Sequence, residues 1–559
     1  MKKLLSCLLA LALTAALAVP VAGAVSYTDI PANSALAGEV QKAVDYGLMN
    51  GYSAVKFGYG DSMTRAQFVT VLSRMMGWED SSQSITDAMA LPANLSEGYR
   101  AAIGAAVSHD AVDRNAAFHP NDAITRGEMS EMLVRALGLK SAAEQLENIC
   151  VSHQYWPSGS NAFPAHFSDV HERIGYIEIA YAAGMTKGYS DTTFGPDNTA
   201  TRAQAAAMLV RIYEKLHQNT EFVHGFYAIS SHSQLALAED MDAVSAGWSR
   251  MTWDGETALL ATTGVGNNEF AVPGGYGEVV EALEEHNVSL HLNVFMDGQS
   301  LKDMLASEDG RSQAVEQIVN ELTVDYKAIG RNPYSGVTID FEGLQSANIG
   351  DFDQFMKMLS REVHSLDKQL YLCVPPYLES DTQYNGYHIG YTAKLADKVI
   401  LMAYGYDPLN MSEFVGTEYY KTAATTPIGQ VYLGLHAMVD GYDIDPNKVV
   451  LGFSSRNVAW KIDENGKLLS GTPVYPTTET VVKRLAQSDT VKGCSNTYQQ
   501  SYAIYTTEDG GRYFLWYQDG QSVQTALNAA KLLGITGVSI WRLGTIPDSA
   551  DWNWNSLLN

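Results

Sequence analysis

Two acidic residues, Asp340 and Glu342, end an otherwise apolar run that begins at Gly336. If this run is a β-strand, its side chains alternate, so both carboxyl groups share one face with Thr338. Two neighbouring carboxyl groups ionise less readily than one alone, and we expect the pair to retain a proton. A carboxyl group that retains its proton can act as the general acid that cleavage of a glycosidic bond requires.

Seven further strand-like runs follow or precede this one in the part of the chain from about residue 218 onward. Longer helical patterns separate them, and this alternation predicts parallel β/α architecture: a (β/α)8 TIM barrel of about 340 residues with insertions. The expected strands are 222–229, 243–248, 289–295, 336–342, 369–375, 399–404, 449–454 and 537–543. The active site of such a barrel lies at the carboxyl ends of its strands. An open doubly wound sheet is the alternative, although no glycine-rich phosphate loop follows an early strand.

The composition limits the kinds of partner. The 559 residues exceed one ordinary domain, and 63 acidic against 37 basic side chains give a net charge of -26. This charge repels nucleic acids and anionic membrane surfaces at long range, whereas neutral glycans stay compatible with it. Beyond the amino-terminal segment the cysteines are widely spaced, at positions 150, 373 and 494, so neither a disulfide scaffold nor a metal site is expected, and no cofactor.

The first 24 residues have the pattern of a secretory signal peptide. Lys2 and Lys3 precede an apolar run, and Ala22-Gly23-Ala24 forms a small-residue cleavage site. We expect the mature protein to begin near Val25, to be exported, and to have no membrane insertion after cleavage, since no later run reaches about 18 apolar residues. An uncleaved anchor is the alternative.

Three similar motifs recur in the amino-terminal half, each followed by an apolar helical pattern. They are Thr64-Arg65-Ala66-Gln67, Thr125-Arg126-Gly127-Glu128 and Thr201-Arg202-Ala203-Gln204. Their spacing predicts repeats over 25–80, 81–140 and 167–217, with an insertion of no clear periodicity over 141–166. In each repeat the threonine is expected to cap a helix and the arginine to lie near its positive end, where an anion can bind. Helix capping alone is the alternative explanation of the Thr-Arg pairs.

These repeats resemble S-layer homology domains, whose pattern runs from F-x-D through G-Y and F-G-P to T-R-A-E. The third repeat matches best, with Gly188-Tyr189 and Phe194-Gly195-Pro196. The resemblance implies three helical repeats that bind a secondary polymer of the bacterial cell wall and so attach the protein to the cell surface. The arginines of the motifs would contact this acidic polymer: Arg65, Arg126 and Arg202.

From about residue 221 to 559 the chain is similar to family 18 glycoside hydrolases. The segment 336–342 looks like that family's D-G-x-D-x-D-x-E strand, Met402-Ala403-Tyr404 like its M-x-Y strand, and 537–541 like its final G-x-x-x-W strand. The nearest branch includes spore cortex and cell-wall N-acetylglucosaminidases. The resemblance implies hydrolysis of β-linked N-acetylglucosamine glycans, with net retention through the substrate's own acetamido oxygen.

The resemblance also implies a role for each matched residue. Glu342 would protonate the leaving oxygen and then activate water, while Asp340 would hold the acetamido N–H. Tyr404 would bind the acetamido oxygen, and Trp541 would form the floor of the sugar site. Further residues near strand ends are expected to contact the substrate: Asp407, Tyr227 and Trp248, with Asn293 and Tyr377 as unranked candidates.

Three positions depart from the family pattern. Ser335 and Thr338 stand where the fuller motif has Asp, and Gly405 stands where an Asp commonly follows the tyrosine, although Asp407 would reach the same space. These departures leave two alternatives: a catalytically weak or inactive glycan-binding or surface-layer structural protein, or an endo-β-N-acetylglucosaminidase that acts on N-linked glycans. The sequence leaves open the natural substrate, endo or exo action and the oligomeric state.

Overall fold

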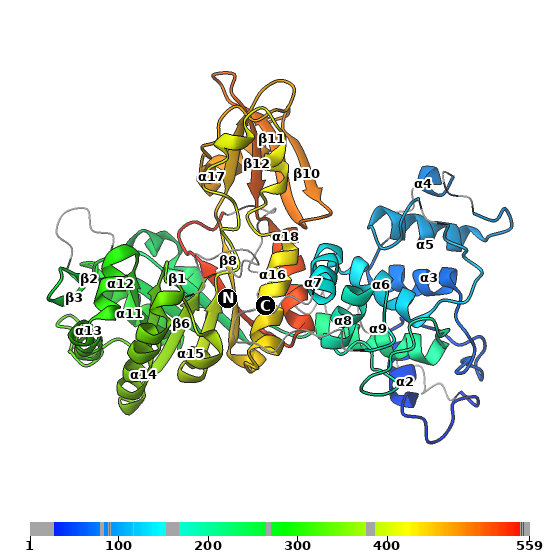
Figure 1. Cartoon of the computed structure of the whole chain (residues 1–559), viewed down its shortest axis with the longest axis horizontal. Helices are drawn as coiled ribbons and strands as arrows, with labels where there is room; N and C mark the ends of the chain where they lie inside the picture. Colours follow the sequence, from blue (N-terminus) through cyan, green and yellow to red (C-terminus); the bar gives the residue numbers. More distant parts are fainter. Residues whose placement is uncertain are drawn as a thin grey trace, which may run out of the picture. The chain divides into compact units, whose positions relative to one another are not determined.

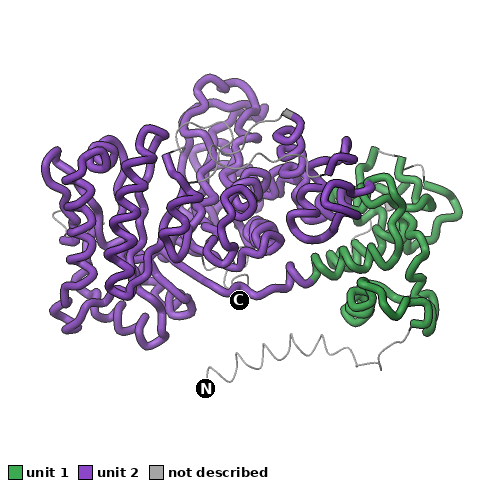
Figure 2. Tube along the Cα trace, turned by 60° about the horizontal axis from the view of Figure 1, so that its bottom comes forward, with its two compact units in different colours: residues 1–129, 196–213 green, residues 130–195, 214–559 purple. Residues whose placement is uncertain are grey.

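The computed structural model describes residues 27–78, 83–87, 89, 91–115, 117–152, 167–263, 270–375, 386–547, 549 and 552. The predicted signal peptide and Tyr377 lie outside these residues. The chain divides into two compact units, residues 1–129 with 196–213 and residues 130–195 with 214–559 (Figure 2). Each unit is described by itself below.

The first unit is built from short helices (Figure 1). They are α2 (Ala37–Asp45), α3 (Arg65–Met75), α4 (Gln83–Asp87), α5 (Glu97–Ser108), the start of α6 (Arg126–Ala136) and most of α9 (Arg202–Leu216). Helix α3 begins after Thr64, whose N–H donates to Gln67 Oε1 at 3.0 Å and whose Oγ1 accepts from the Gln67 N–H at 3.3 Å. The same reciprocal pair starts α6 and α9. Glutamine therefore caps α3 and α9 in the way that Glu128 caps α6.

The turns before these three helices pair with one another in a closed ring. Short antiparallel bridges join Thr64 to Ala123, Thr125 to Thr199, and Ser62 to Thr201. In the same cyclic order, the N–H of each motif arginine donates to a carbonyl in the next turn: Arg65 to Asp122, Arg126 to Asn198, and Arg202 to Asp61. The middle turn thus occupies a place equivalent to the other two.

The loops of the repeats differ more than their turns. Asp29 accepts hydrogen bonds from the backbone N–H groups of three consecutive residues, 57–59. In the second unit, Asp169 accepts from Phe194 and Gly195 in the same way. Within the described part of the chain, Asp87 makes no such bond, so the middle repeat lacks this loop clamp.

The second unit begins with two helices that precede the barrel, α7 (Lys140–Ser152) and α8 (Ile174–Ala182). Helix α7 covers the first part of the predicted insertion, where the sequence showed no clear periodicity, and residues 153–166 lie outside the described residues. The two helices cross closely, since a Cβ on Gly175 would lie 1.8 Å from the Ala143 carbonyl oxygen. Gln145 accepts a hydrogen bond from Gln430 at 2.7 Å, so α7 contacts the barrel helix that contains Gln430.

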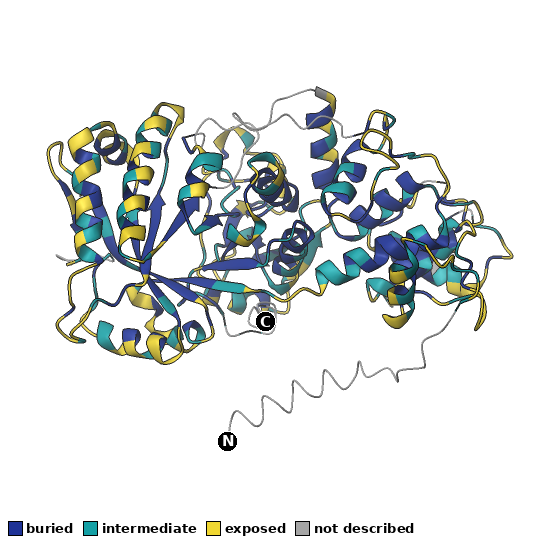
Figure 3. Ribbon diagram, turned by 90° about the horizontal axis from the view of Figure 1, so that it is seen from below, coloured by how far each residue is buried: buried dark blue, intermediate teal, exposed yellow. Residues whose placement is uncertain are grey.

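Eight parallel strands close into a barrel, which confirms the predicted fold. In order around the barrel they are β1 (Phe222–Tyr227), β2 (Ala243–Trp253), β4 (Ser289–Met296), β5 (Gly336–Phe341), β6 (Gln369–Val374), β7 (Lys398–Leu401), β8 (Val449–Ser454) and β13 (Gly537–Trp541). Pairing of β1 with both β2 and β13 closes the ring. The strands are buried, and the helices outside them bury one side and expose the other (Figure 3).

The helices of this part of the chain follow the strands in sequence. They are α10 (Leu235–Ala238), α11 (Tyr276–Glu285), α12 (Gly298–Ala306), α13 (Glu308–Glu321), α14 (Ile349–Ser365), α15 (Ile389–Leu395), α16 (Ile428–His436), α17 (Thr478–Leu485) and α18 (Gly520–Leu532). In the described residues, no helix combines the length and apolar character needed to cross a membrane.

An antiparallel sheet interrupts the barrel between β8 and β13, and the sequence analysis did not anticipate it. Its strands are β9 (Val458–Ile462), β10 (Val491–Ser495), β11 (Gln500–Thr506) and β12 (Arg512–Tyr517). They pack over a separate apolar core that includes Trp460, Phe514 and Trp516. A further short strand, β3 (Ala258–Ala261), extends β2 as a hairpin.

The close approach of β5 to its neighbours gives a test of how firmly the acid-bearing strand is placed. A Cβ on Gly336 would lie 2.3 Å from the Gln369 carbonyl oxygen and 2.6 Å from His291 Cε1. We expect Gly336→Ala to force β5 aside and to lower the free energy of unfolding by about 1–3 kcal/mol, measured by thermal unfolding. The control is Gly350→Ala in α14, where a Cβ meets nothing within 4 Å. Equal stability of the two variants would contradict this account.

Candidate active site

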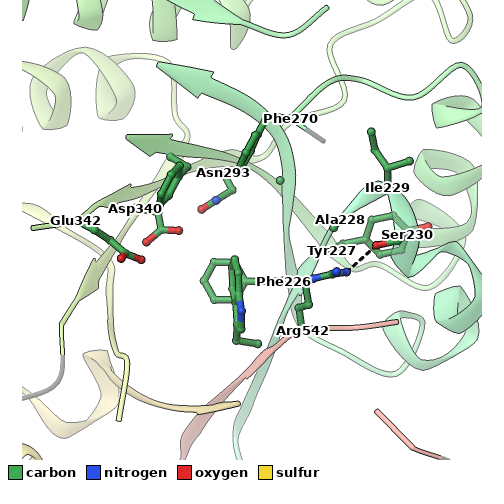
Figure 4. Close-up of a pocket in the computed structure, with 13 residues that line it drawn as sticks. Phe226, Tyr227, Ala228, Ile229, Ser230, Phe270, Asn293, Asp340, Glu342 and Arg542 are labelled. Carbon is green, nitrogen blue, oxygen red and sulfur yellow. Dashed lines mark hydrogen bonds between the residues drawn. The ribbon is translucent and has the colours of Figure 1, made fainter. Parts of the chain in front are cut away.

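Two adjoining cavities lie at the carboxyl ends of the barrel strands, with volumes of about 410 and 390 Å³. Both are lined by Asp340, Glu342, Trp541 and Arg542. The two carboxyl groups that the sequence placed on one strand face therefore point into the same space (Figure 4). Trp541, which has 37% of its surface exposed, lies in the wall that the cavities share.

The first cavity is mainly aromatic. Phe226 and Trp541 meet in a T-shaped contact at 5.0 Å, and Phe270 stacks on Phe295 with ring centroids 5.5 Å apart. The Arg250 guanidinium covers the outer pair at 5.4 and 5.2 Å from the two centroids. Aromatic faces of this kind can pack against the apolar face of a sugar ring.

The second cavity is more polar. Besides the shared residues it is lined by Tyr404, Ser454, Ser455, Arg456 and Thr545. Ser455 and Thr545 hydrogen-bond each other at 2.6 Å. Hydroxyl and guanidinium groups therefore face this half of the cleft, where they can bond to polar substituents of a glycan.

Burial keeps the acid pair protonated to unusually high pH. The pKa of Asp340 is raised to about 8, first by burial and second by the charge of Glu342, while hydrogen bonds from Asn293 and Cys373 lower it in part. Burial also raises the pKa of Glu342, and the charge of Asp297 adds to this. The sequence argument rested on mutual repulsion, whereas removal from water is the larger cause. The pair can hold a proton for transfer near neutral pH.

Tyr404 lies within the electrostatic reach of this pair. Its pKa is raised well above the ordinary value, first by burial and then by the nearby acidic groups, foremost Asp340. The hydroxyl group therefore stays protonated and can donate a hydrogen bond into the second cavity. Both Tyr404 and Trp541 line the space into which the acids point.

Asp407 lies beneath the second cavity rather than on its surface. Its side chain is fully buried, and Oδ2 accepts a hydrogen bond from Arg456 Nη2 at 2.9 Å. The Arg456 guanidinium also covers the Tyr475 ring at 4.7 Å. Gly405 adopts φ 78°, a conformation that glycine reaches without strain. Asp407 thus holds Arg456 in position, and it is Arg456 that lines the cavity.

Tyr227 and Trp248 differ in their relation to the site. Tyr227 lines the first cavity, and burial raises its pKa to about 12. Trp248 is fully buried behind it, in a T-shaped contact at 6.3 Å, and does not line either cavity. The structure therefore brings Tyr227 to the site and leaves Trp248 as its support.

The barrel interior below the acids contains a chain of neutral hydrogen bonds. Thr338 bonds to Ser245 at 2.6 Å, Ser245 to His224 at 2.7 Å, and His224 to Ser539 at 2.7 Å. Burial lowers the pKa of His224 to about 3, so the imidazole is neutral. Thr338, which stands where the family motif has Asp, is thus paired within this layer.

The three motif arginines of the repeats are in different environments. Arg65 is partly exposed and pairs with Glu128, with 2.5 Å between Nη2 and Oε1. Arg126 and Arg202 are buried. Arg202 donates to the carbonyl groups of Asn50 and Phe57, so a direct contact between its guanidinium and a polymer would need these bonds to break.

Several residues in or next to the site were missed or unranked in the sequence. Asn293, an unranked candidate, hydrogen-bonds Asp340, and Cys373, expected only as a core residue, does so too. Arg456 and Arg542 were not singled out, although Arg542 directly follows Trp541 and could have been found from that position. Phe270 and Phe295 carried no sequence signal that separates them from core residues.

A (β/α)8 barrel with a buried acid pair beside an aromatic wall is an architecture suited to a glycoside hydrolase. The family model of glycosyl hydrolases family 18 matches residues 191–545, and the chain belongs to this family. The model of the S-layer homology domain matches residues 26–69 and 166–206. Two S-layer homology domains are thus found, and the predicted middle repeat is not matched.

Among curated relatives, the chain is 23% identical to the cortical fragment-lytic enzyme of Bacillus subtilis (strain 168) over 279 residues, 48% of this chain and 60% of that protein. It is 28% identical to an endoglucanase of Bacillus sp. (strain KSM-635) over 246 residues, 42% of this chain and 24% of the endoglucanase. The chain therefore spans less than two thirds of either relative. Among solved structures, the spore cortex-lytic enzyme SleL of Bacillus megaterium QM B1551 matches with TM-score 0.47 and 16% identity, over 68% of this chain and 80% of that one.

The raised pKa of Asp340 predicts a specific pH dependence of stability. Since the folded-state pKa lies above the unfolded one, the folded protein binds more protons from ~pH 4 upward. The free energy of unfolding of the wild type therefore falls as pH rises toward about 8. The Asn side chain of Asp340→Asn cannot ionise. We therefore expect the free energy of unfolding of this variant to exceed that of the wild type by about 1 kcal/mol or more at high pH, and to show no such gain at low pH.

Thermal unfolding of both proteins across this pH range measures the difference. Asp325→Asn, at an exposed position, is the matched control. A gain for Asp340→Asn that is the same at low and high pH would show that ionisation of Asp340 is not its cause.

Proposed function

We propose that this protein is a retaining hydrolase of β-linked N-acetylglucosamine glycans, of the chitin or peptidoglycan type. The observation that carries the proposal is the half-buried Glu342 beside Asp340, with a raised pKa, in a cleft lined by Trp541 and Tyr404. Glu342 protonates the glycosidic oxygen and afterwards takes a proton from water. The chain's membership of family 18 supports this assignment.

In the proposed mechanism the substrate supplies the nucleophile. Asp340 accepts the acetamido N–H and Tyr404 donates to the acetamido oxygen, which aligns that oxygen with the anomeric carbon. A cyclic oxazolinium forms as the leaving group departs, and water then opens it with net retention, one of the exceptions to the two-carboxylate scheme. The Trp541 ring supports the sugar from below.

Glu342→Gln gives the direct test of this mechanism. The amide keeps the shape of the side chain but has no proton to transfer, so we expect kcat on chitotetraose to fall at least ~100-fold while binding persists. Mass spectrometry of the products measures turnover, and Glu362→Gln on α14 is the control. A fully active Glu342→Gln protein would remove Glu342 from the mechanism.

The acetamido nucleophile is tested with the matched substrate. A tetramer of glucosamine, which lacks the acetyl groups, should bind without being cut. Cleavage of that tetramer as fast as chitotetraose would exclude substrate assistance. Binding of chitotetraose by the wild type without cleavage would favour the alternative of a non-catalytic glycan-binding protein. That alternative is suggested by Thr338, which stands where the family motif has Asp.

We further propose that the amino-terminal part holds the exported enzyme on the cell wall through three S-layer homology repeats. Two repeats match the family model. Support for a third comes from the turn at Thr125, which shares the helix cap and the ring of bridges with the turns at Thr64 and Thr201. The proposed divisions remain 25–80, 81–140 and 167–217, followed by the catalytic part from 218.

Wall attachment can be tested with the full chain. Among the motif arginines, Arg65 keeps partial exposure, so we expect Arg65→Gln to weaken sedimentation with purified cell walls by several-fold, because each lost charge contact costs about 1 kcal/mol. Arg114→Gln, at an exposed position outside the motifs, removes the same charge and should leave sedimentation unchanged. Failure of the wild type to sediment with walls would contradict the anchoring proposal.

A further inference from the structure

Arg542 occupies an unusual position in the cleft. It lines both cavities and lies across the first one from Glu342 and Asp340 (Figure 4). Its Nη1 donates to Ser230 Oγ at 2.9 Å and contacts Ser231 Oγ and the Leu543 carbonyl oxygen at 3.5 and 3.4 Å. One nitrogen of the guanidinium is thereby anchored, and the described residues provide no hydrogen bond for Nε or Nη2.

The charge of Arg542 is not balanced by a protein carboxylate in the described part of the chain. Two neighbouring arginines are paired: Arg250, which lines neither cavity, with Asp297 at 2.9 Å, and Arg456 through Nη2 with Asp407 at 2.9 Å. The catalytic acids do not take this role either, since the hydrogen bonds that Arg542 makes among the described residues go to Ser230, Ser231 and the Leu543 carbonyl group. Among the residues that the structure describes, Arg542 is thus a cation without a carboxylate partner in the cleft of a chain whose net charge is -26.

A neutral chitin chain has no charge to match this cation, whereas a planar guanidinium is suited to a carboxylate. Arg456 lines the same cavity, and its Nε is buried without a hydrogen-bond partner among the described residues. Arg542 follows Trp541 directly, so the cation stands beside the residue that supports the sugar ring. A carboxylate attached close to the ring would reach it.

We propose that Arg542, with Arg456 in the same cavity, binds the lactyl carboxylate of a muramic acid residue next to the N-acetylglucosamine that is cut. This inference rests on the proposed glycosidase function and narrows its substrate to peptidoglycan-type glycans. In an alternating polymer the neighbours of each N-acetylglucosamine are muramic acids. Where no stem peptide is attached, their lactyl group ends in a free carboxylate, joined to the ring through a single ether. Arg542 is then a specificity-determining residue rather than a catalytic one.

The experiment measures binding in the Glu342→Gln background, so it does not depend on turnover. The ligands are a tetrasaccharide of alternating N-acetylglucosamine and N-acetylmuramic acid with free lactyl carboxylates, and its neutral methyl ester. By titration calorimetry we expect the acid to bind about tenfold more tightly than the ester, because one charge-assisted contact is worth roughly that ratio. The ratio should decrease as salt is added.

Variants then assign the effect. Adding Arg542→Gln should bring the acid-to-ester ratio close to one, and Arg542→Lys should restore part of it. Arg361→Gln is the matched control, since it removes the same charge from the outer surface of α14, where Arg361 is 77% exposed. Thermal unfolding shows that each variant is folded before its ratio is compared.

Several outcomes would overturn the inference. The first is no binding of the acid ligand. The second is equal affinity for the acid and the ester when Arg542 is intact, and the third is an acid-to-ester ratio that Arg542→Gln does not change. A third ligand, with the lactyl carboxyl joined to L-alanyl-D-glutamate, separates the possible sources of charge. If it binds as tightly as the free acid, the carboxylate belongs to the peptide and the lactyl assignment is wrong. Failure of the proposed hydrolysis would appear separately, as an inactive wild type with an intact ratio.

Discussion

Removal of two carboxyl groups from water at the mouth of the barrel is the constraint that organises the surrounding structure. Asp340 is nearly fully buried, so its charged form is costly unless its neighbours compensate. Asn293 and Cys373 supply hydrogen bonds to it, and the layer below consists of uncharged groups around His224. A further ionised residue in that layer would raise the free-energy cost of ionising Asp340. The uncharged Thr338 avoids this cost.

In the proposed function, the two halves of the cleft recognise different features of the glycan. The aromatic wall around Phe226 and Phe295 can bury the faces of sugar rings without regard to their substituents. The polar half holds groups that can distinguish one substituent from another, and their positions are fixed by neighbouring side chains: Asp407 and Tyr475 for Arg456, and Ser230 for Arg542. Such supports reduce the conformational entropy that binding would otherwise cost.

Much of the barrel follows from the sequence because its strands are local and strongly patterned. All eight runs were found, and period-two alternation placed Asp340, in β5, and Glu342, directly after that strand, on the same face. The antiparallel sheet was missed, although Asp509-Gly510 between two β-rich runs is a hairpin signal. Arg542 and Phe270 could not be ranked, because their role depends on which distant strands meet at the cleft. For Trp248 the sequence prediction of a substrate contact was wrong. Its position near a strand end did not decide whether its side chain faces the cavity or the core.

Both parts of the molecule are closed by contacts between segments that are far apart in the chain. Ser62 pairs with Thr201 in the ring of turns, and β1 pairs with β13 in the barrel. Neither closure can form until its second segment has been synthesised, and closing such long loops has an entropic cost that slows folding. A nascent chain that has emerged only as far as β12 therefore exposes the unpaired edges of β1 and β8. Folding of the barrel is completed late, when β13 has been synthesised. Until then these two strand edges stay open to pairing with other chains.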